Sequence, residues 1–452
     1  MLDTLITDGC YPDFERDKMI EANIGIENGK ISYIGDQRLP ARRIIDGAER
    51  VVSPGFIDIH MHEENFQEDG SGYIIGELML KMGVTTVCGG NCGMQNQRLS
   101  QFKRMIERLG GAPVNYVMLA GYNQMRYLLG IGHNERISPK QQRQVLDLLR
   151  EELEAGARGI SFGIEYDPAI TFDEMAEALT LLHGDQSYLA AAHFRQSADG
   201  ALESIKEMIT LSEVSGTKFL ISHLGSCSAT GQMAESLELI DEAKKKHLGV
   251  DFDIYPYNAF STLIGSEVFE KESLDQWCKD IGTIMLTQEP YKNVYCTEDL
   301  LQKARSEYPD MLAVGFIMDE EEIAQAMSHK CGMIASDGIL NGGKGHPRAA
   351  GTFPRVLGRY VREQKRLSLL DALRKMTLYP AERLSLPAKG RIAIGADADL
   401  TVFDPKTILD CASYDNLYQQ PEGIDYVLIG GCVALDHKQV ACDRLGSFIP
   451  FP

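Results

Sequence analysis

The sequence predicts an α/β protein in which a (β/α)8 barrel, the TIM-barrel arrangement, is joined to a small β-sandwich formed from both ends of the chain. From residue 54 to residue 386, short apolar strands alternate with helical stretches, which is the pattern of βα units and a parallel sheet. The flanking residues 1–53 and 387–452 contain short strands and turns instead. At 452 residues the chain exceeds a typical single domain, so we expect one large and one accessory domain.

The two ends of the chain share one kind of pattern. Near the start, the Asn-Gly of "ENGK" lies between two alternating runs and is a strong signal for a β-hairpin. Near the finish, "GRIAIGADADLTVFDP" and "DYVLIGGCVALDHKQV" are typical of further strands. Because these β-rich ends bracket a different middle portion, we expect them to meet in one sandwich, with the barrel inserted between them.

The middle portion contains eight strand candidates: FIDIH, VTTVCGG, YVMLAG, RGISFG, YLAAAH, KFLISH, GVDFDIY and GMIASDG. The helix before the fourth candidate begins with Ser138, Pro139 and Gln141 at the N-cap, first-turn and capping-box positions. A βα period repeated eight times favours a closed barrel over an open, doubly wound sheet. The stretch from about 258 to 330 is too long for a simple connection, so we expect an insertion over the mouth of the barrel, such as a lid.

Charge and composition exclude several classes of protein. A formal charge of −20 argues against binding to nucleic acids or anionic membranes, because the surface would repel phosphates. No apolar run reaches the roughly 18 residues of a membrane span, and "MLDTLITDGC" lacks the features of an export signal, so we expect a cytoplasmic protein. The ten cysteines are scattered without a CxxC pair, which argues against a disulfide framework.

Potential metal ligands follow the strand candidates. Active sites of such barrels lie at the carboxyl ends of the strands. His60 and His62 come at the end of the first candidate, and alternation along a strand would point both side chains the same way. The other candidate ligands or acid/base groups on this rim are Cys92, Glu165, His193, His223 and Asp337.

Each of these residues also has an ordinary structural interpretation. A single histidine is more often a packing or surface residue, Cys92 a small buried hydrophobe, Glu165 a salt-bridge partner, and Asp337 part of an Asp-Gly turn. However, four of only ten histidines occur at the ends of strand candidates one, five and six, which favours a metal site. Imidazole with thiolate or carboxylate suits zinc best. The number of ligands exceeds one tetrahedral set, so we expect one or two zinc ions, with a bridging ligand and an open position for water.

Several longer motifs resemble a known family. They are "PGFIDIHMH", "GVTTVCGGNCG", "ISH", "DIYPY", "ASDG", "HPRAAGTFPRVLGRYVRE" and "GADADLTVFDP". Together they resemble the amidohydrolase superfamily and, within it, the N-acyl-D-amino-acid deacylases, or D-aminoacylases, over nearly the whole chain.

The resemblance implies a ligand set. Cys92, His193 and His223 would hold the tighter zinc ion, and His60 and His62 a weaker second ion. Asp337 would bind metal and act as general base and then general acid, which agrees with the chemistry of a metal-activated water. The bridge is either Cys92 or the carboxylate of Glu165 at the end of the fourth strand, and the GNCG match favours Cys92.

Recognition of a substrate carboxylate calls for a guanidinium or similar donors. Arg348 is the first candidate, and the others are His346, Tyr255, Tyr257 and Arg195. For each, a surface salt bridge is the alternative interpretation. One departure from the family pattern is Gly225, where a lysine is frequent two residues after the histidine of the sixth strand.

The predicted function is zinc-dependent hydrolysis of the amide bond of small N-acyl-D-amino acids. The alternative within enzymes is a cyclic-amide hydrolase of the hydantoinase or dihydroorotase kind on the same metal site. A catalytically silent scaffold protein is the alternative outside enzymes, and it is disfavoured because no ligand is missing. A homo-oligomer is compatible with the sequence, which does not specify the number of subunits.

Overall fold

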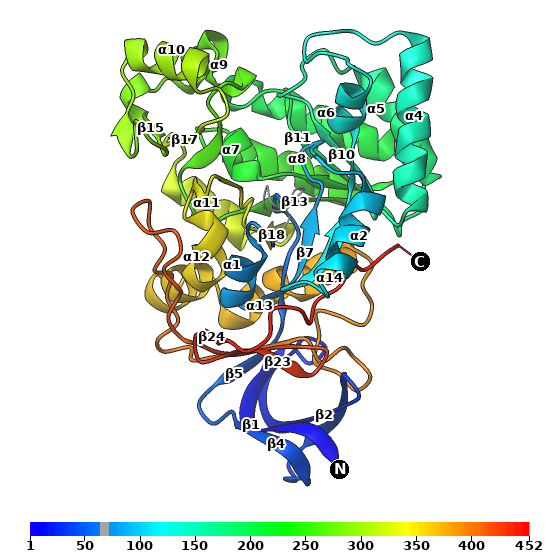
Figure 1. Cartoon of the computed structure of the whole chain (residues 1–452), viewed down its shortest axis with the longest axis vertical. Coiled ribbons are helices and arrows are strands. Elements are labelled where there is room, and N and C mark those ends of the chain that lie inside the picture. Colours follow the sequence, from blue (N-terminus) through cyan, green and yellow to red (C-terminus); the bar gives the residue numbers. More distant parts are fainter. Residues whose placement is uncertain (64–71, 452) are drawn as a thin grey trace.

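The computed structural model describes residues 1–63 and 72–451. In Figure 1 the N-terminal strands (blue) lie at the lower end of an elongated molecule next to strands from near the C-terminal end (orange to red), the middle portion (cyan to yellow) forms the rest, and the C-terminus itself lies beside this middle portion. No helix in the described part of the chain is long and apolar enough to cross a membrane.

Both chain ends contribute to one sheet. Its strand order is β24-β23-β22-β21-β5-β1-β2-β3, with β4 paired to β1. Antiparallel pairing of β5 with β21 joins the two ends. Between β2 and β3, Asn28 and Gly29 have φ values of 52° and 75°, as a type I′ turn requires, so the hairpin predicted from "ENGK" is confirmed. The strands are β1 (Leu2–Asp13), β2 (Lys18–Glu27), β3 (Lys30–Gly35), β4 (Ala41–Asp46), β5 (Val51–Pro54), β21 (Leu400–Phe403), β22 (Ile424–Ile429), β23 (Cys432–Asp436) and β24 (Gln439–Val440).

The middle portion is built on two parallel sheets, with the orders β6-β7-β8 and β18-β13-β12-β11-β10-β9. Only Leu119 separates β8 from β9, and a parallel bridge joins Met61, which follows β6, to Gly338, which follows β18. Each of the strand candidates from the sequence therefore has a counterpart here. The strands are β6 (Phe56–Asp58), β7 (Val84–Gly89), β8 (Asn115–Met118), β9 (Ala120–Gly121), β10 (Gly159–Gly163), β11 (Leu189–His193), β12 (Lys218–Ile221), β13 (Val250–Ile254) and β18 (Gly332–Ile334).

These parallel strands are buried on both faces. In β11, Leu189 and Ala191 belong to one apolar cluster, whereas Ala190 and Ala192 belong to a second cluster shared with the helices. Because side chains alternate along a strand, a strand covered on both faces has a continuous apolar sequence.

Helices connect the strands. At the start of α4 the backbone N–H of Gln141 donates to the Ser138 hydroxyl and the Gln141 side chain accepts from the Ser138 N–H, so the predicted capping box is confirmed. The helical elements are α1 (Gly76–Lys81), α2 (Leu99–Arg108), α3 (Tyr122–Leu128), α4 (Pro139–Glu154), α5 (Phe172–Leu179), η1 (Thr180–Leu182), η2 (Ala198–Gly200), α6 (Ala201–Ser215), α7 (Leu224–Ser228), α8 (Met233–Lys245), α11 (Glu320–Ser328), α12 (Arg348–Arg355), η5 (Val356–Glu363), α13 (Leu369–Met376) and α14 (Leu378–Arg383).

Between β13 and α11 the chain forms a separate antiparallel sheet of order β14-β17-β15-β16. With α9 and α10, it projects at the upper left of Figure 1. Its elements are β14 (Phe260–Leu263), η3 (Glu267–Phe269), α9 (Lys271–Trp277), η4 (Ile281–Thr283), β15 (Ile284–Leu286), β16 (Val294–Tyr295), α10 (Glu298–Glu307) and β17 (Leu312–Gly315), and a small hairpin follows β18 as β19 (Leu340–Asn341) and β20 (Lys344–Gly345).

The last residues leave the sheet of the chain ends. Gly446 bridges to Ala112, and Phe448 bridges to Tyr116 in β8. The backbone N–H of Phe451 donates to the carbonyl of Gly156. The C-terminal segment therefore packs along the middle portion of the chain.

Candidate metal centre

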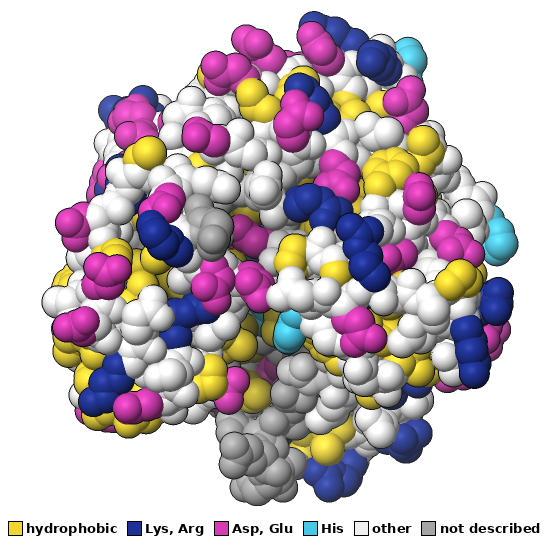
Figure 2. Space-filling view, turned by 90° about the horizontal axis from the view of Figure 1, so that it is seen from above, with side chains coloured by type: hydrophobic (Ala, Val, Ile, Leu, Met, Phe, Trp, Pro, Cys, Tyr) yellow, Lys and Arg dark blue, Asp and Glu magenta, His cyan; other side chains and the backbone are white. Residues whose placement is uncertain are grey.

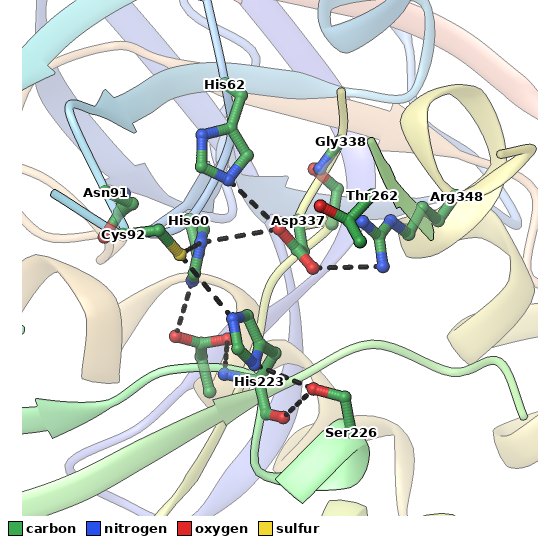
Figure 3. A network of polar contacts seen from close by, with 12 residues as sticks. His60, His62, Asn91, Cys92, His223, Ser226, Thr262, Asp337, Gly338 and Arg348 are labelled. Carbon is green, nitrogen blue, oxygen red and sulfur yellow. Dashed lines mark hydrogen bonds and ion pairs between the residues drawn. The ribbon is translucent and has the colours of Figure 1, made fainter. Parts of the chain in front are cut away.

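Histidine, cysteine and aspartate side chains converge at the carboxyl ends of the parallel strands (Figure 3). The Sγ atom of Cys92 lies 3.3 Å from Nε2 of His60 and 3.6 Å from Nε2 of His223. The Oδ1 atom of Asp337 lies 3.2 Å from Nε2 of His62 and 3.5 Å from Nε2 of His60. These residues form two groups of closely spaced ligand atoms, His60–Cys92–His223 and His60–His62–Asp337, which share His60.

Three of these residues have left-handed backbone conformations. The φ values are 53° for Cys92, 36° for His223 and 47° for Asp337. Such conformations cost non-glycine residues about 1 kcal/mol or more each, and they persist where the surroundings enforce them. At Asp337 the backbone N–H donates to the carbonyl of His60 at 2.8 Å, which ties the turn after β18 to the end of β6. The chain thus holds these side chains in place at the expense of local strain.

Two buried aspartates hold His60, and sequence reasoning assigned neither of them a role. Asp253 in β13 contacts Nδ1 of His60 at 3.0 Å and accepts the backbone N–H of His223 at 2.8 Å. Asp58 accepts the backbone N–H groups of His60 and Ser336. With Nδ1 bound to Asp253, the imidazole of His60 presents Nε2 to Cys92 and Asp337, which is the usual arrangement of a histidine that binds metal.

The surroundings favour the ionised forms of two candidate ligands. Burial would raise the pKa of Cys92, but His60, His193 and His223 bring it well below its usual value. Burial would likewise raise the pKa of Asp337, but Arg348, followed by His60, holds it well below its usual range. By contrast, burial raises the pKa of the Cys88 thiol. Cys92 is therefore suited to be a thiolate, and Cys88 remains a thiol packed in the core.

Glu165 lies beside His193. Its Oε2 atom is 2.7 Å from Nε2 of His193. Burial lowers the pKa of His193, whereas Cys92 and Glu165 raise it, and the balance brings it to about 9. Nδ1 of His193 is buried without a hydrogen-bond partner in the described part of the protein. The ring of His193 lies 4.5 Å from the ring of His223, so His193 adjoins the two close ligand groups but belongs to neither of them.

Arg348 adjoins the ligand groups. Its Nη1 atom lies 3.0 Å from Oδ2 of Asp337 (Figure 3), and Nη2 donates to the carbonyl of Ser261. The guanidinium lies over the ring of Tyr255, 4.6 Å from its centroid. His346 accepts the backbone N–H of Arg348 through Nδ1 at 3.0 Å. The structure therefore brings three of the predicted substrate-binding residues together beside Asp337.

The other two predicted substrate-binding residues have separate partners. Tyr257 packs edge-on against His346 and under the guanidinium of Arg355. Arg195 is held by both carboxylate oxygens of Glu207, at 2.9 and 2.7 Å.

A cavity of about 300 Å³ opens beside the ligand groups and is lined in part by His62, Cys92, Asp337 and Arg348. Figure 2 shows the molecule from above, with acidic and basic side chains around a central hollow and a histidine at the hollow. His133 also lines the cavity, with Nδ1 2.7 Å from the buried carboxylate of Asp167. No strand-end motif marks His133, so the sequence offered no signal for it.

Comparison with known proteins agrees with these observations. The model of the amidohydrolase family matches residues 51–433. The chain is 31% identical to N-acyl-D-glutamate deacylase of Alcaligenes xylosoxydans xylosoxydans, over 95% of this chain and 93% of that protein. It is 29% identical to the D-aminoacylase of the same organism, with the same coverage.

Solved structures give the same picture. N-acyl-D-glutamate deacylase of Bordetella bronchiseptica, complexed with zinc and a phosphonate mimic of the tetrahedral intermediate, matches with a TM-score of 0.88 and 27% identity over 99% of both chains. A D-aminoacylase described as having a binuclear metal center matches with a TM-score of 0.88 and 26% identity over 100% of both chains. A D-hydantoinase shares the fold at a TM-score of 0.64 and 19% identity. The chain belongs to the amidohydrolase family, as its strand-end motifs predict.

Proposed function

We propose that this protein hydrolyses the amide bond of N-acyl-D-amino acids, releasing a carboxylate and a D-amino acid. The observation that carries the proposal is the convergence of His60, Cys92, His223 and Asp337 at one point of a chain that is similar over nearly its full length to N-acyl-D-amino-acid deacylases. Cyclic-amide hydrolysis has less support, because D-hydantoinase shares only the fold.

The residues at this point fit zinc. Imidazole nitrogens, a thiolate and a carboxylate are ligands that zinc accepts, and the free buried Nδ1 of His193 calls for a partner. In our proposal Cys92, His193 and His223 would hold one ion, and His60, His62 and Asp337 would hold a second. Zinc supplies Lewis acidity, which activates water and polarises a carbonyl group.

For the bridging ligand we propose Cys92 rather than Glu165. The sulfur atom lies within 3.6 Å of a nitrogen from each proposed ligand set, His223 of the first and His60 of the second. The carboxylate of Glu165 is instead engaged by Nε2 of His193. In this position Glu165 orients the imidazole of His193, in the same way that Asp253 orients His60.

Asp337 is the proposed general base and acid. Its lowered pKa keeps the carboxylate ionised at neutral pH, so that it can accept a proton from the attacking water. The same carboxyl group can then deliver the proton to the leaving nitrogen. The ion pair with Arg348 fixes the orientation of the carboxylate.

Arg348 is the proposed partner of the substrate carboxylate. It lines the cavity, and its Nε makes no hydrogen bond within the described residues, whereas Nη1 is ion-paired with Asp337 at 3.0 Å. The guanidinium of Arg348 lies over the ring of Tyr255, and the backbone N–H of Arg348 donates to His346. Tyr257 in turn packs edge-on against His346. We do not extend this role to Arg195, because Glu207 already occupies its guanidinium.

We also propose a closed (β/α)8 barrel over residues 54–386 and a β-sandwich formed by the two chain ends. The bridge between Met61 and Gly338 supports closure of the barrel. One apolar cluster shared by Ile26 and Ile31 from the start of the chain and Leu428 from its end supports the sandwich. The predicted cytoplasmic location stays a prediction.

The test is a hydrolysis screen of the zinc-loaded enzyme. N-acetyl-D-amino acids, their L enantiomers and a set of hydantoins are incubated in parallel, and the released amine is quantified by chromatography. We expect turnover of the D-amides only. Hydrolysis confined to hydantoins, or to none of these compounds, would contradict the proposed function.

A further inference from the structure

Two connected recesses adjoin the ligand groups and share Tyr166, Ser261, Thr262 and Asp337 in their walls. The inner recess lies over His193 and offers about 30 Å³. The outer recess offers about 300 Å³ and includes Arg348. The inner one has room for roughly two water molecules, whereas the outer one is large enough for an amino-acid side chain.

The inner recess has an apolar wall. The large side chains of this wall are all buried: Phe194, Phe260, Val268, Trp277 and Ile317. The indole of Trp277 packs edge-on against Phe260 at 5.3 Å, and its N–H donates to Ser197. The hydroxyl of Ser226 is engaged by Nδ1 of His223. This recess therefore accepts a small apolar group such as the methyl of an acetyl group.

The outer recess is also largely apolar, with walls that include Met94, Tyr127, Leu263, Pro309 and Ile339. Its acidic groups are three carboxylates, Glu267, Asp310 and Asp337, and its guanidinium among the described residues is that of Arg348. Arg348 already faces Asp337, and in the proposed function it binds the α-carboxylate of the substrate.

Another cationic side chain near the outer recess is already engaged by other groups. Arg305, near the outer recess, donates to the carbonyls of Ile264 and Ser266 and pairs with Glu270. Within the described lining, no lysine or second arginine is present, and the imidazole of His133 is already paired with the buried carboxylate of Asp167, so a second negative charge on the substrate would meet Glu267 and Asp310.

We propose that this site selects N-acyl-D-amino acids that carry a short acyl group and an uncharged, largely apolar side chain, and that it rejects N-acyl-D-glutamate and N-acyl-D-aspartate. The inference rests on the proposed function and sets its substrate class. A carboxylate that leaves water without a partner is strongly disfavoured, and like charges nearby add to the effect. The relative at 31% identity is a D-glutamate deacylase, so sequence similarity alone would suggest the opposite preference.

The test compares kcat/KM of the zinc-loaded enzyme for the N-acetyl derivatives of D-leucine, D-methionine, D-glutamine, D-glutamate and D-aspartate. Glutamine matches glutamate in shape without its charge. We expect leucine and methionine to exceed glutamate by about a hundredfold or more, with glutamine also above glutamate. If N-acetyl-D-glutamate or N-acetyl-D-aspartate is hydrolysed as fast as N-acetyl-D-leucine, this inference alone is overturned. If no D-amide is hydrolysed, the proposed function is overturned as well.

A pair of variants in the outer recess tests whether the charge of its wall determines the preferred substrate side chain. Leu263→Lys places a cation in its wall, and Leu263→Met is the matched uncharged control. We expect the lysine variant to raise the glutamate-to-leucine ratio of kcat/KM at least about tenfold over the methionine variant. Equal ratios in two folded variants would show that the substrate side chain lies elsewhere and would overturn the assignment.

A second variant tests the inner recess. The wild-type enzyme should prefer N-acetyl- over N-hexanoyl-D-leucine by at least about tenfold, because the longer acyl chain does not fit. Trp277→Ala removes the largest wall residue and should lower the ratio of N-acetyl- to N-hexanoyl-D-leucine hydrolysis. Equal use of both acyl groups by the wild-type enzyme would contradict the short-acyl assignment.

Discussion

At the scale of single residues, the site depends on side chains that orient the candidate metal ligands. His60 is the centre: Asp253 binds its Nδ1, and its Nε2 lies within reach of both Cys92 and Asp337. His60 was predictable from the strand-end pattern. Asp253 was not, because it lies 193 residues away in sequence and meets His60 only in the folded chain.

Replacing the proposed proton carrier tests the chemistry. Asp337→Asn should lower kcat about a thousandfold, since general acid/base catalysis typically contributes a factor of this size. The ion proposed to be held by Cys92, His193 and His223 should remain bound, and the fold should be retained. Steady-state kinetics with metal analysis by mass spectrometry provides the check. Near-normal turnover would refute the role of Asp337.

Replacing the carboxylate behind His60 tests orientation. Asp253→Asn removes the charge that fixes the imidazole, and such outer partners typically change metal affinity about 10- to 100-fold. We expect the ion proposed to be held by His60 and His62 to bind more weakly by that factor in a chelator-competition titration. Asp147→Asn, at an exposed carboxylate on α4, is the control. An unchanged metal affinity in Asp253→Asn would argue against a role of Asp253 in orienting His60.

At the scale of elements, the features that depend on neighbouring residues in the sequence were predicted correctly. The Asn-Gly hairpin and the α4 capping box depend on neighbouring residues, and both predictions are confirmed. The first parallel strand ends earlier than predicted, at Asp58 rather than His60. His62 nevertheless reaches the site, because the Met61 bridge to Gly338 continues the path of the strand. Strand ends depend on pairing with distant segments, which the sequence pattern does not contain.

The capping box of α4 carries a stability prediction. Ser138→Ala removes the acceptor for the Gln141 N–H and should cost about 1 kcal/mol in the free energy of unfolding. Urea denaturation measures the difference. Lys140→Ala in the same first turn is the control and should change stability by less. A Ser138→Ala variant as stable as the wild type would show that the cap contributes nothing.

At the scale of the whole molecule, the two ends of the chain meet in one sheet, and the C-terminal segment returns to pack along β8. Alternating strands and helices predicted the parallel sheets correctly, since this pattern reflects burial on both faces of each strand. Which carboxylates and cations line the recesses could not be predicted, because those walls combine loops from distant parts of the sequence. The net charge of −20 likewise says nothing about the local pairing of Arg348.

The dependence of stability on pH offers a global test. Burial lowers the pKa of Lys375 to about 8, whereas an unfolded lysine titrates near 10.4. Below about pH 8 the residue is charged in both states and its burial is fully unfavourable. Between about pH 8 and 10.4 the unfolded state binds more protons, so this residue makes stability rise with pH.

Lys375→Met should remove that contribution. The difference in unfolding free energy between variant and wild type should shift by roughly 2 kcal/mol in favour of the wild type from pH 7.5 to pH 10. Urea denaturation at several pH values supplies the measurement. A difference that stays constant with pH would contradict the lowered pKa.

The most direct test of the account is the zinc content of the wild-type protein and of Cys92→Ser, measured after exhaustive dialysis. We predict tightly bound zinc in the wild type and its loss in the variant, with the fold intact by circular dichroism. Equal zinc retention in both proteins would contradict the metal centre on which the proposed chemistry depends.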